Sequence, residues 1–258
     1  MIKTTTTLHW LPKTGNAIAE YEDAYHPLYG GDYAGEHLRF AVADGASEGM
    51  LSGQWAKILV SEYCQADAPT LDMPALIERC HPVWQKWLKH YLQHRDYQGK
   101  PIQWFEEPGF ERGAFSTLLG LHLLTHEGRG QWEALAVGDS CLFQIRNNHL
   151  LGGFPIKKSA DFDSRPFLIA SNPKNNAGLP DHIRKIRGKW RPGDQFFLIT
   201  DALAYWFWSE IEAGHPAWQI LLEVARQDTA ALADWLQALK NDKRIRNDDV
   251  TLLIVEMR

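Results

Sequence analysis

The chain has 258 residues, of which 45% are hydrophobic and 23% are charged. This length and apolar content suffice for one large domain or two small ones, and they exclude a disordered or fibrous chain. The 32 acidic side chains outnumber the 27 basic ones and give a net charge of −5, which disfavours nucleic acid and anionic membranes as partners. An anionic substrate would therefore need a local source of positive charge, such as a bound cation.

The three cysteines are widely spaced and form no CxxC or Cys/His pattern. We therefore expect reduced thiols and neither a disulfide framework nor a zinc site. The N-terminal segment lacks the apolar core of a signal peptide, and no apolar run is long enough to span a bilayer. These features predict a cytoplasmic, monomeric protein with no nucleic-acid or membrane partner.

Seven runs along the chain have the residue pattern of β-strands, with polar and apolar residues alternating or with short β-branched and aromatic blocks. In chain order they are Thr4–Trp10, Leu38–Ala43, Phe115–Leu124, Trp132–Val137, Cys141–Arg146, Gln195–Thr200 and Val250–Glu256. Short turns separate several of these runs, which is typical of hairpins and antiparallel sheets.

Helices are predicted after the second of these strands and before the last. Apolar residues at helical spacing fill an insertion of about residues 52–95, in which Pro82 opens or kinks the second helix. A further apolar face begins at Leu232, with Asp228 as its N-cap. The polar stretch 152–189 has no clear periodicity, and a loop of that length is usually functional or contains unrecognised elements. Since strands and helices do not alternate regularly, we expect an α+β fold with helices outside antiparallel sheets.

Four aspartates stand at the ends of strand-like runs. Asp44, Asp139 and Asp201 follow such runs, and Asp248 precedes the last one. A carboxylate at the end of a buried strand is costly unless it caps a turn or binds a cation, and for any one of them a turn is the simpler explanation. Four together favour an all-oxygen site, which suits Mg²⁺ or Mn²⁺ better than zinc.

The same aspartates belong to an ordered series of short motifs. The series is TG…EDA (Thr14, Gly15, Glu22, Asp23, Ala24), ADG (Ala43–Gly45), ST…G (Ser116, Thr117, Gly120), VGDS (Val137–Ser140), TDA (Thr200–Ala202) and DDVT (Asp248–Thr251). It resembles the metal-dependent protein phosphatase family, the PPM or type 2C serine/threonine phosphatases, as a divergent bacterial-type member. The resemblance implies one domain over residues 1–258 with a four-layer αββα sandwich, two antiparallel β-sheets flanked by helices. Family members use a flap near the active site, and residues 152–189 are the candidate for it, although the sequence leaves this open.

The resemblance further assigns ligands for two Mn²⁺ or Mg²⁺ ions and for a third. Asp44 matches a carboxylate that bridges the first two ions, and Gly45 matches the residue whose carbonyl binds the first. Asp201 and Asp248 match ligands of the second ion. Asp139 matches the carboxylate that holds a third metal together with the residue at Asp201.

Two more acidic residues, Glu22 and Asp23, match positions that orient metal-bound water, so that with Asp44 they form the expected catalytic group. The implied activity is hydrolysis of phosphoserine and phosphothreonine phosphomonoesters on proteins by a metal-activated water. The implied partners are a phosphorylated protein substrate and a cognate serine/threonine kinase.

Several positions depart from the family pattern. Ile18 replaces the arginine that binds phosphate, Tyr21 replaces an asparagine, and Ala46 follows ADG where some members have a histidine. The substrate-binding residue is therefore unknown, and the sequence does not choose among Arg39, Lys13 and Arg112. These departures support a second hypothesis, a weak or inactive family member that binds phosphoproteins or regulates a partner. A phosphatase for a small metabolite is a third.

Two features near the C-terminus add charge beside the predicted site. Asp249 replaces the family's asparagine and brings one more negative charge. The basic run Lys240–Arg246 directly precedes this region. A solvated loop is its simplest explanation, but it could also steer phosphorylated substrates toward the site.

Overall fold

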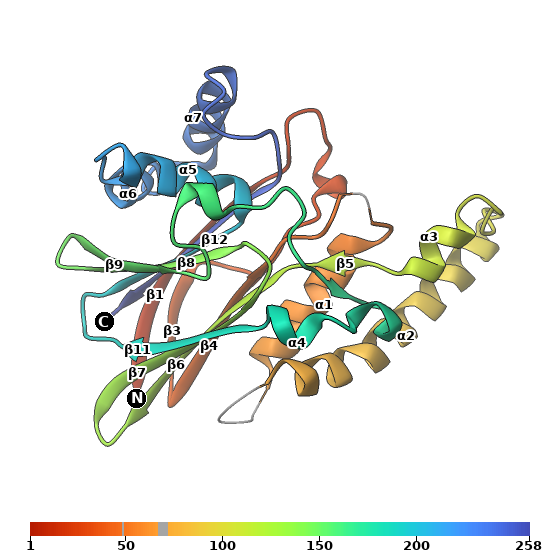
Figure 1. The fold of residues 1–258 in the computed structure, drawn as a ribbon, viewed down its shortest axis with the longest axis horizontal. Helices are drawn as coiled ribbons and strands as arrows, with labels where there is room; N and C mark the ends of the chain where they lie inside the picture. Colours follow the sequence, from red (N-terminus) through yellow and green to blue (C-terminus); the bar gives the residue numbers. More distant parts are fainter. Residues whose placement is uncertain (48, 67–71) are drawn as a thin grey trace.

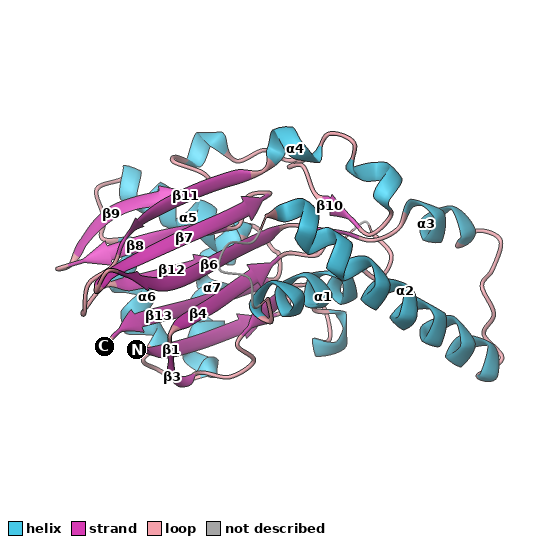
Figure 2. Ribbon diagram, turned by 90° about the horizontal axis from the view of Figure 1, so that it is seen from below, coloured by secondary structure: helices cyan, strands magenta, loops and turns pink. Residues whose placement is uncertain are grey.

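The computed structural model describes residues 1–47, 49–66 and 72–258, and in them two large antiparallel sheets lie face to face (Figures 1 and 2). The first sheet has the strand order β3-β1-β13-β12-β8-β9 and the second has the order β11-β7-β6-β4-β2. The first consists of β1 (Ile2–Leu11), β3 (Gly31–Gly35), β8 (Cys141–Arg146), β9 (His149–Phe154), β12 (Gln195–Ile199) and β13 (Val250–Met257). The second consists of β2 (Ala24–His26), β4 (His37–Ala43), β6 (Leu118–His126), β7 (Arg129–Val137) and β11 (Arg184–Lys189). A short pair, β5 (Phe115–Ser116) and β10 (Ile169–Ala170), lies beside them.

Helices cover the outer face of each sheet. The first sheet carries α5 (Asp201–Glu212), α6 (Ala217–Ala225) and α7 (Thr229–Asn241), and the second carries α1 (Ser52–Cys64) and α2 (Met73–Tyr97). The shorter helices are α3 (Glu107–Arg112), α4 (Leu179–His182) and the 3-10 turns Ile18–Glu20, Ser159–Asp161 and Pro173–Asn176. The predicted four-layer αββα sandwich is confirmed. In the described part of the chain, no helix has the length and apolar content needed to cross a membrane.

Three buried clusters hold the layers together, and β13 shows how the sequence produces them. Leu252 and Ile254 pack against α5–α7, whereas Leu253 and Val255 pack against the second sheet. Successive side chains of a strand point to opposite faces, so a strand covered on both faces needs apolar residues throughout. This is why the C-terminal run of the chain is continuously apolar.

The strands β8 and β9 form an antiparallel hairpin. Asn147 and Asn148 both have positive φ angles, 49° and 60°. Consecutive left-handed residues make the turn type whose twist matches that of antiparallel strands, and asparagine tolerates this conformation better than most residues.

The predicted helix boundaries are partly wrong. Pro82 does not open α2, because the helix begins at Met73 and the Asp72 side chain caps it by accepting a hydrogen bond from the Ala75 N–H at 2.9 Å. The predicted cap of α7 is confirmed, since Asp228 accepts the Ala231 N–H at 2.9 Å. The part of the predicted insertion at residues 67–71 lies outside the described residues.

Two strand assignments also change. The predicted strand Phe115–Leu124 is divided at Thr117 into β5 and β6, because the main chain of Thr117 bonds to Asp44 at this point. The stretch 152–189 contains β10, β11, α4 and short 3-10 turns. The sequence of β11, RKIRGK, shows no apolar alternation because this strand lies at the edge of its sheet and is largely exposed.

Candidate metal centre

The four strand-end aspartates line one cavity of about 420 Å³ at the end of the two sheets. Asp44 follows β4 and Asp139 follows β7, both in the second sheet. Asp201 follows β12 and Asp248 precedes β13, both in the first sheet. We call this space the aspartate cavity. The sequence predicted that these four residues converge, and the fold brings them together from both sheets.

The main chain of Asp44 is fixed by the hydroxyl groups of the ST motif. The Asp44 N–H donates to Thr117 Oγ1 at 2.8 Å, and the Asp44 carbonyl accepts the Thr117 N–H, also at 2.8 Å. The Ser116 hydroxyl donates to the same carbonyl at 2.8 Å. Thr117 Oγ1 lies 3.0 Å from Ser140 Oγ, next to Asp139. This network connects two of the four aspartates.

Gly45 lies where three segments meet. A Cβ atom at this position would stand 2.6 Å from the Glu22 carbonyl oxygen and 2.8 Å from the Ser52 carbonyl carbon. Contacts that short are sterically forbidden, so only glycine allows this approach. The glycine thereby lets the Glu22–Asp23 segment and the start of α1 pack directly against Asp44.

Asp23 lies behind the cavity wall and is only 1% exposed. Its Oδ2 accepts a hydrogen bond from Thr251 Oγ1 at 2.7 Å, and the Tyr21 hydroxyl also bonds to Thr251 Oγ1. The Thr251 N–H in turn donates to Thr200 Oγ1 at 2.9 Å. Asp23 is therefore tied to β13 and to the residue before Asp201. The Tyr21 side chain, which departs from the family pattern, takes part in the same network.

Glu22 faces a neighbouring cavity of about 490 Å³, which it lines together with Lys13. Ser47 lines both cavities, and its Oγ accepts a hydrogen bond from Lys13 Nζ at 3.0 Å. Asp249 fixes the backbone of Lys13 and Glu22. Its two carboxylate oxygens accept hydrogen bonds from the N–H groups of Lys13 at 2.8 Å and Glu22 at 2.7 Å. The fold thus places Glu22 next to the aspartate cavity but not among the residues that line it.

The electrostatics of the aspartate cavity show an excess of negative charge. Burial raises the pKa of Asp44 well above its usual range, and the charges of Asp23 and Asp201 raise it further. Burial, with Asp201 as second cause, raises the pKa of Asp139 to about 7. Burial, with Asp248 as second cause, raises the pKa of Asp201 to about 6. Carboxylates this close together resist ionisation unless a cation compensates their charge.

The donor set fits hard divalent cations. The Oδ1 atom of Asp139 is buried and has no hydrogen-bond partner among the described residues. Carboxylate oxygens are the ligands that Mg²⁺ and Mn²⁺ prefer, and a buried acceptor without a donor is costly unless it binds an ion. Among residues 1–47, 49–66 and 72–258, no three His, Cys, Asp or Glu side chains already enclose a point that could hold an ion.

Two arginines that sequence reasoning did not select line the aspartate cavity. Arg246 lies with its guanidinium 5.8 Å from the centre of the Tyr205 ring, and it partly offsets the effect of burial on the pKa of Asp201. Arg165 stands in a loop whose turn is fixed by a hydrogen bond from its N–H to Asp163 Oδ1 at 3.0 Å. Arg246 belongs to the basic run noted in the sequence, and that run was the signal that could have identified it.

The three residues considered as replacements for the missing arginine lie elsewhere. Arg39 lines a cavity on the outer face of the second sheet. Arg112 lines a cavity with Ala46 and Gly49, and Lys13 lines the cavity of Glu22. Ile18 itself is 71% exposed.

No protein-family model and no curated protein matches this chain. Solved structures do match it, and they show that the chain has the fold of the metal-dependent (PPM, type 2C) protein phosphatases. The fold implied by the motif resemblance is therefore confirmed.

Three of these structures illustrate the similarity. The catalytic domain of the serine/threonine protein phosphatase PstP, in complex with two manganese ions, is 15% identical with a TM-score of 0.53, over 100% of this chain and 99% of that one. The photosystem II phosphatase PBCP is 15% identical with a TM-score of 0.55, over 99% of both chains. PppA, a regulatory component of the type VI secretion system in Pseudomonas aeruginosa, is 18% identical with a TM-score of 0.51, over 99% of this chain and 98% of that one.

Proposed function

We propose that this protein is a metal-dependent phosphatase that hydrolyses phosphoserine and phosphothreonine on proteins. The observation that carries the proposal is that Asp44, Asp139, Asp201 and Asp248 line one cavity at the end of the two sheets. The fold shared with solved serine/threonine phosphatases supports it, as does the binding of manganese by one of them.

The aspartates have distinct proposed roles. Asp44, Asp201 and Asp248, with the carbonyl of Gly45, would hold two Mn²⁺ or Mg²⁺ ions, and Asp139 would take part in holding a third. Such ions acidify a water molecule for attack on phosphorus and neutralise the phosphoryl oxygens. Asp23 is a positioning residue, because its bond to Thr251 orients the strand that follows Asp248.

The structure supports a new assignment for phosphate binding. Arg246 and Arg165 line the aspartate cavity, and guanidinium groups donate paired hydrogen bonds to phosphate oxygens. We propose that these arginines replace the function lost at Ile18. The loop of residues 163–168 lies within the predicted flap and contributes to the lining of the cavity, which supports a role for it in binding the substrate.

Glu22 has a different proposed role because it lies one cavity away. Burial raises the pKa of Glu22, while a hydrogen bond with Ser47 and the charge of Lys13 oppose this effect. Since Ser47 lines both cavities, Glu22 can act on water near the aspartates through Ser47. We propose that it orients water and does not bind an ion directly.

The second candidate function is a weak or inactive member that binds phosphoproteins. It is motivated by Ile18, Tyr21 and Ala46, which depart from the family pattern. In this case the protein would bind a phosphorylated partner, including the substrate of a cognate kinase, without turnover.

Calorimetric titration with Mn²⁺ beside a turnover assay with a phosphothreonine peptide separates the two functions. An enzyme binds Mn²⁺ and turns over the peptide, and Asp201→Asn loses both properties. The matched control Asp234→Asn removes an exposed carboxylate on α7 and retains both. Mn²⁺ binding without turnover would support the binding module, and turnover that survives Asp201→Asn would reject the proposed site.

A further inference from the structure

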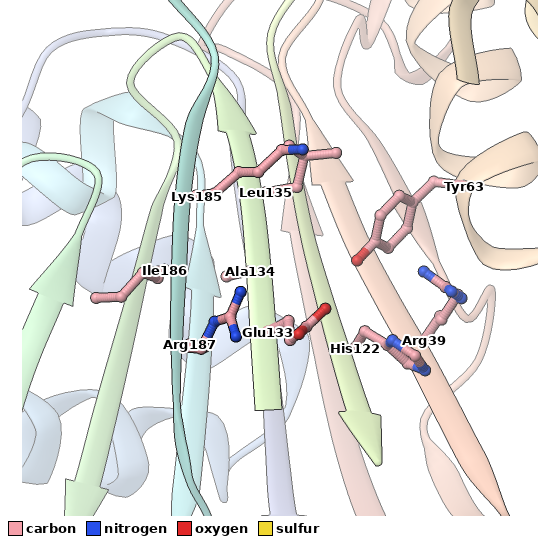
Figure 3. Close-up of a pocket in the computed structure, with 9 residues that line it drawn as sticks. All are labelled: Arg39, Tyr63, His122, Glu133, Ala134, Leu135, Lys185, Ile186 and Arg187. Atoms are coloured by element: carbon pink, nitrogen blue, oxygen red, sulfur yellow. The ribbon is translucent and has the colours of Figure 1, made fainter. Parts of the chain in front are cut away.

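A second cavity of about 320 Å³ lies on the outer face of the second sheet (Figure 3). Its walls come from β4, β6, β7 and β11, with Tyr63 of α1 on one side. None of the residues that line it lines the aspartate cavity. The size of the cavity is typical of a small-molecule site.

The strand register places four polar residues in one row across this sheet. Residues directly opposite each other in antiparallel strands point to the same face, so the side chains of the row stand together. The row consists of Arg39 on β4, His122 on β6, Glu133 on β7 and Arg187 on β11. Lys185, two residues from Arg187, stands on the same face and also lines the space. We call this the cationic cavity.

The charge of the cationic cavity is opposite to that of the whole protein. Lys185 and Arg187 are positive and Glu133 is negative, on a chain whose total charge is −5. Arg39 also lines the cavity; it is only 9% exposed, and its guanidinium lies 5.3 Å from the centre of the Tyr63 ring.

Two groups in the row, His122 and Glu133, have unused hydrogen-bonding capacity. His122 is 3% exposed, and its Nε2 has no hydrogen-bond partner among the described residues. Burial, and then the charges of Arg39 and His37, lowers the pKa of His122 to about 4, so its ring is neutral at pH 7. The carboxylate of Glu133 forms no ion pair within 4.0 Å in the described part of the chain, although Arg187 stands opposite it. Unsatisfied polar groups cost free energy, which a ligand with matching donors and acceptors would recover.

We propose that the cationic cavity binds a small phosphomonoester that carries hydroxyl groups. A phosphomonoester has a charge close to −2 near neutral pH, so it can pair with both Lys185 and Arg187, whereas a single carboxylate carries only one charge. Its phosphate oxygens accept hydrogen bonds from Arg187 and Lys185. A hydroxyl group of the ligand donates to Glu133, and another polar atom bonds to Nε2 of His122. This site does not depend on the function proposed for the aspartate cavity.

The test is a titration of the metal-free, full-length protein with glycerol 3-phosphate, followed by NMR of the His122 ring nitrogens. We expect saturable shifts with glycerol 3-phosphate, weaker binding of inorganic phosphate, and no shift with glycerol. Arg187→Ala should weaken the binding of glycerol 3-phosphate at least tenfold. Arg226→Ala, which removes an exposed arginine at the end of α6, should leave it unchanged.

A second variant guards against a loss that merely reflects misfolding. Glu133→Gln removes the one negative charge of the cavity, so inorganic phosphate should bind about fivefold tighter. A damaged fold cannot give tighter binding. The proposal is overturned if glycerol 3-phosphate causes no shift of His122, if Arg187→Ala binds as well as the parent protein, or if Glu133→Gln fails to tighten phosphate binding.

Discussion

Asp44 and Thr117 are joined by two reciprocal hydrogen bonds, in which the Asp44 N–H donates to Thr117 Oγ1 and the Thr117 N–H donates to the Asp44 carbonyl, both at 2.8 Å. Asp44 follows β4 and Thr117 lies between β5 and β6, 73 positions further along the chain. This pairing fixes the backbone of the residue to which we assign the bridging of two ions. It also explains why β5 ends at Ser116 and the next strand, β6, starts at Leu118.

Removal of the Thr117 hydroxyl should therefore weaken both the fold and the ion site. Thr117→Val leaves the partly buried Asp44 N–H without its acceptor, which costs about 1–3 kcal/mol of unfolding free energy. We expect a lower Tm and weaker Mn²⁺ binding by calorimetry. Thr117→Ser keeps the hydroxyl and should lose much less. Equal Mn²⁺ affinity in the valine and serine variants would show that this bond does not position Asp44.

Gly45 should tolerate no side chain. In Gly45→Ala the new Cβ would stand 2.6 Å from the Glu22 carbonyl oxygen, so the backbone must shift at a cost of about 1–3 kcal/mol. Chemical denaturation measures this change directly. Gly152→Ala is the matched control, because a Cβ at that position meets nothing within 4 Å. If both variants unfold at the same denaturant concentration as the parent, the close approach at Gly45 is not rigid.

The stability of the metal-free protein should fall as the pH rises. Burial, with Asp201 as second cause, raises the pKa of Asp139 to about 7 in the folded chain, whereas an unfolded aspartate titrates near 4. Between these pH values the folded state binds one more proton than the unfolded state. The stabilisation of the fold by protonated Asp139 is therefore full below about pH 4 and is lost by about pH 7.

This pH effect can be isolated with Asp139→Asn, which cannot titrate. The decrease in Tm from about pH 5 to about pH 7.5 should be larger in the parent protein than in the variant, both after metal removal. Differential scanning calorimetry measures both curves. Parallel curves would mean that Asp139 ionises as freely in the folded chain as in the unfolded one.

Arg246 should contribute to substrate binding. Loss of a charge-assisted hydrogen bond to phosphate costs about 1.5–3 kcal/mol, so Arg246→Ala should lower kcat/KM for a phosphothreonine peptide about 10- to 100-fold. Steady-state kinetics at saturating Mn²⁺ give this value. Arg226→Ala removes an exposed arginine at the end of α6 and serves as the control. If kcat/KM is unchanged in Arg246→Ala, Arg165 would remain as the arginine that lines the cavity and donates hydrogen bonds to phosphate.

The parts of this structure that the sequence predicted well are local. The aspartates at the ends of apolar strands and the Asp228 cap are visible as short patterns, because burial of the strand and capping of the helix each depend on neighbouring residues. The four-layer fold follows from the motif series. The helix start at Met73 was missed because the prediction relied on Pro82, whereas the buried face already begins with Met73, Leu76 and Ile77.

Features that depend on register could not be predicted in this way. The row of Arg39, His122, Glu133 and Arg187 forms only when four strands pair, and the polar edge strand β11 gives no apolar pattern that marks it as a strand. The position of Arg246 in the aspartate cavity likewise depends on how the loop before β13 folds back. These contacts are long-range, and no short segment of sequence encodes them.

The most direct test of the central claim is the initial rate of hydrolysis of a phosphothreonine peptide with and without Mn²⁺, in the parent protein and in Asp44→Asn. We predict Mn²⁺-dependent release of phosphate by the parent, its loss on chelation, and a rate near background in Asp44→Asn at every Mn²⁺ concentration. A rate for Asp44→Asn equal to that of the parent, or no Mn²⁺-dependent hydrolysis by the parent, would contradict the claim that the aspartate cavity is a metal-dependent phosphatase site.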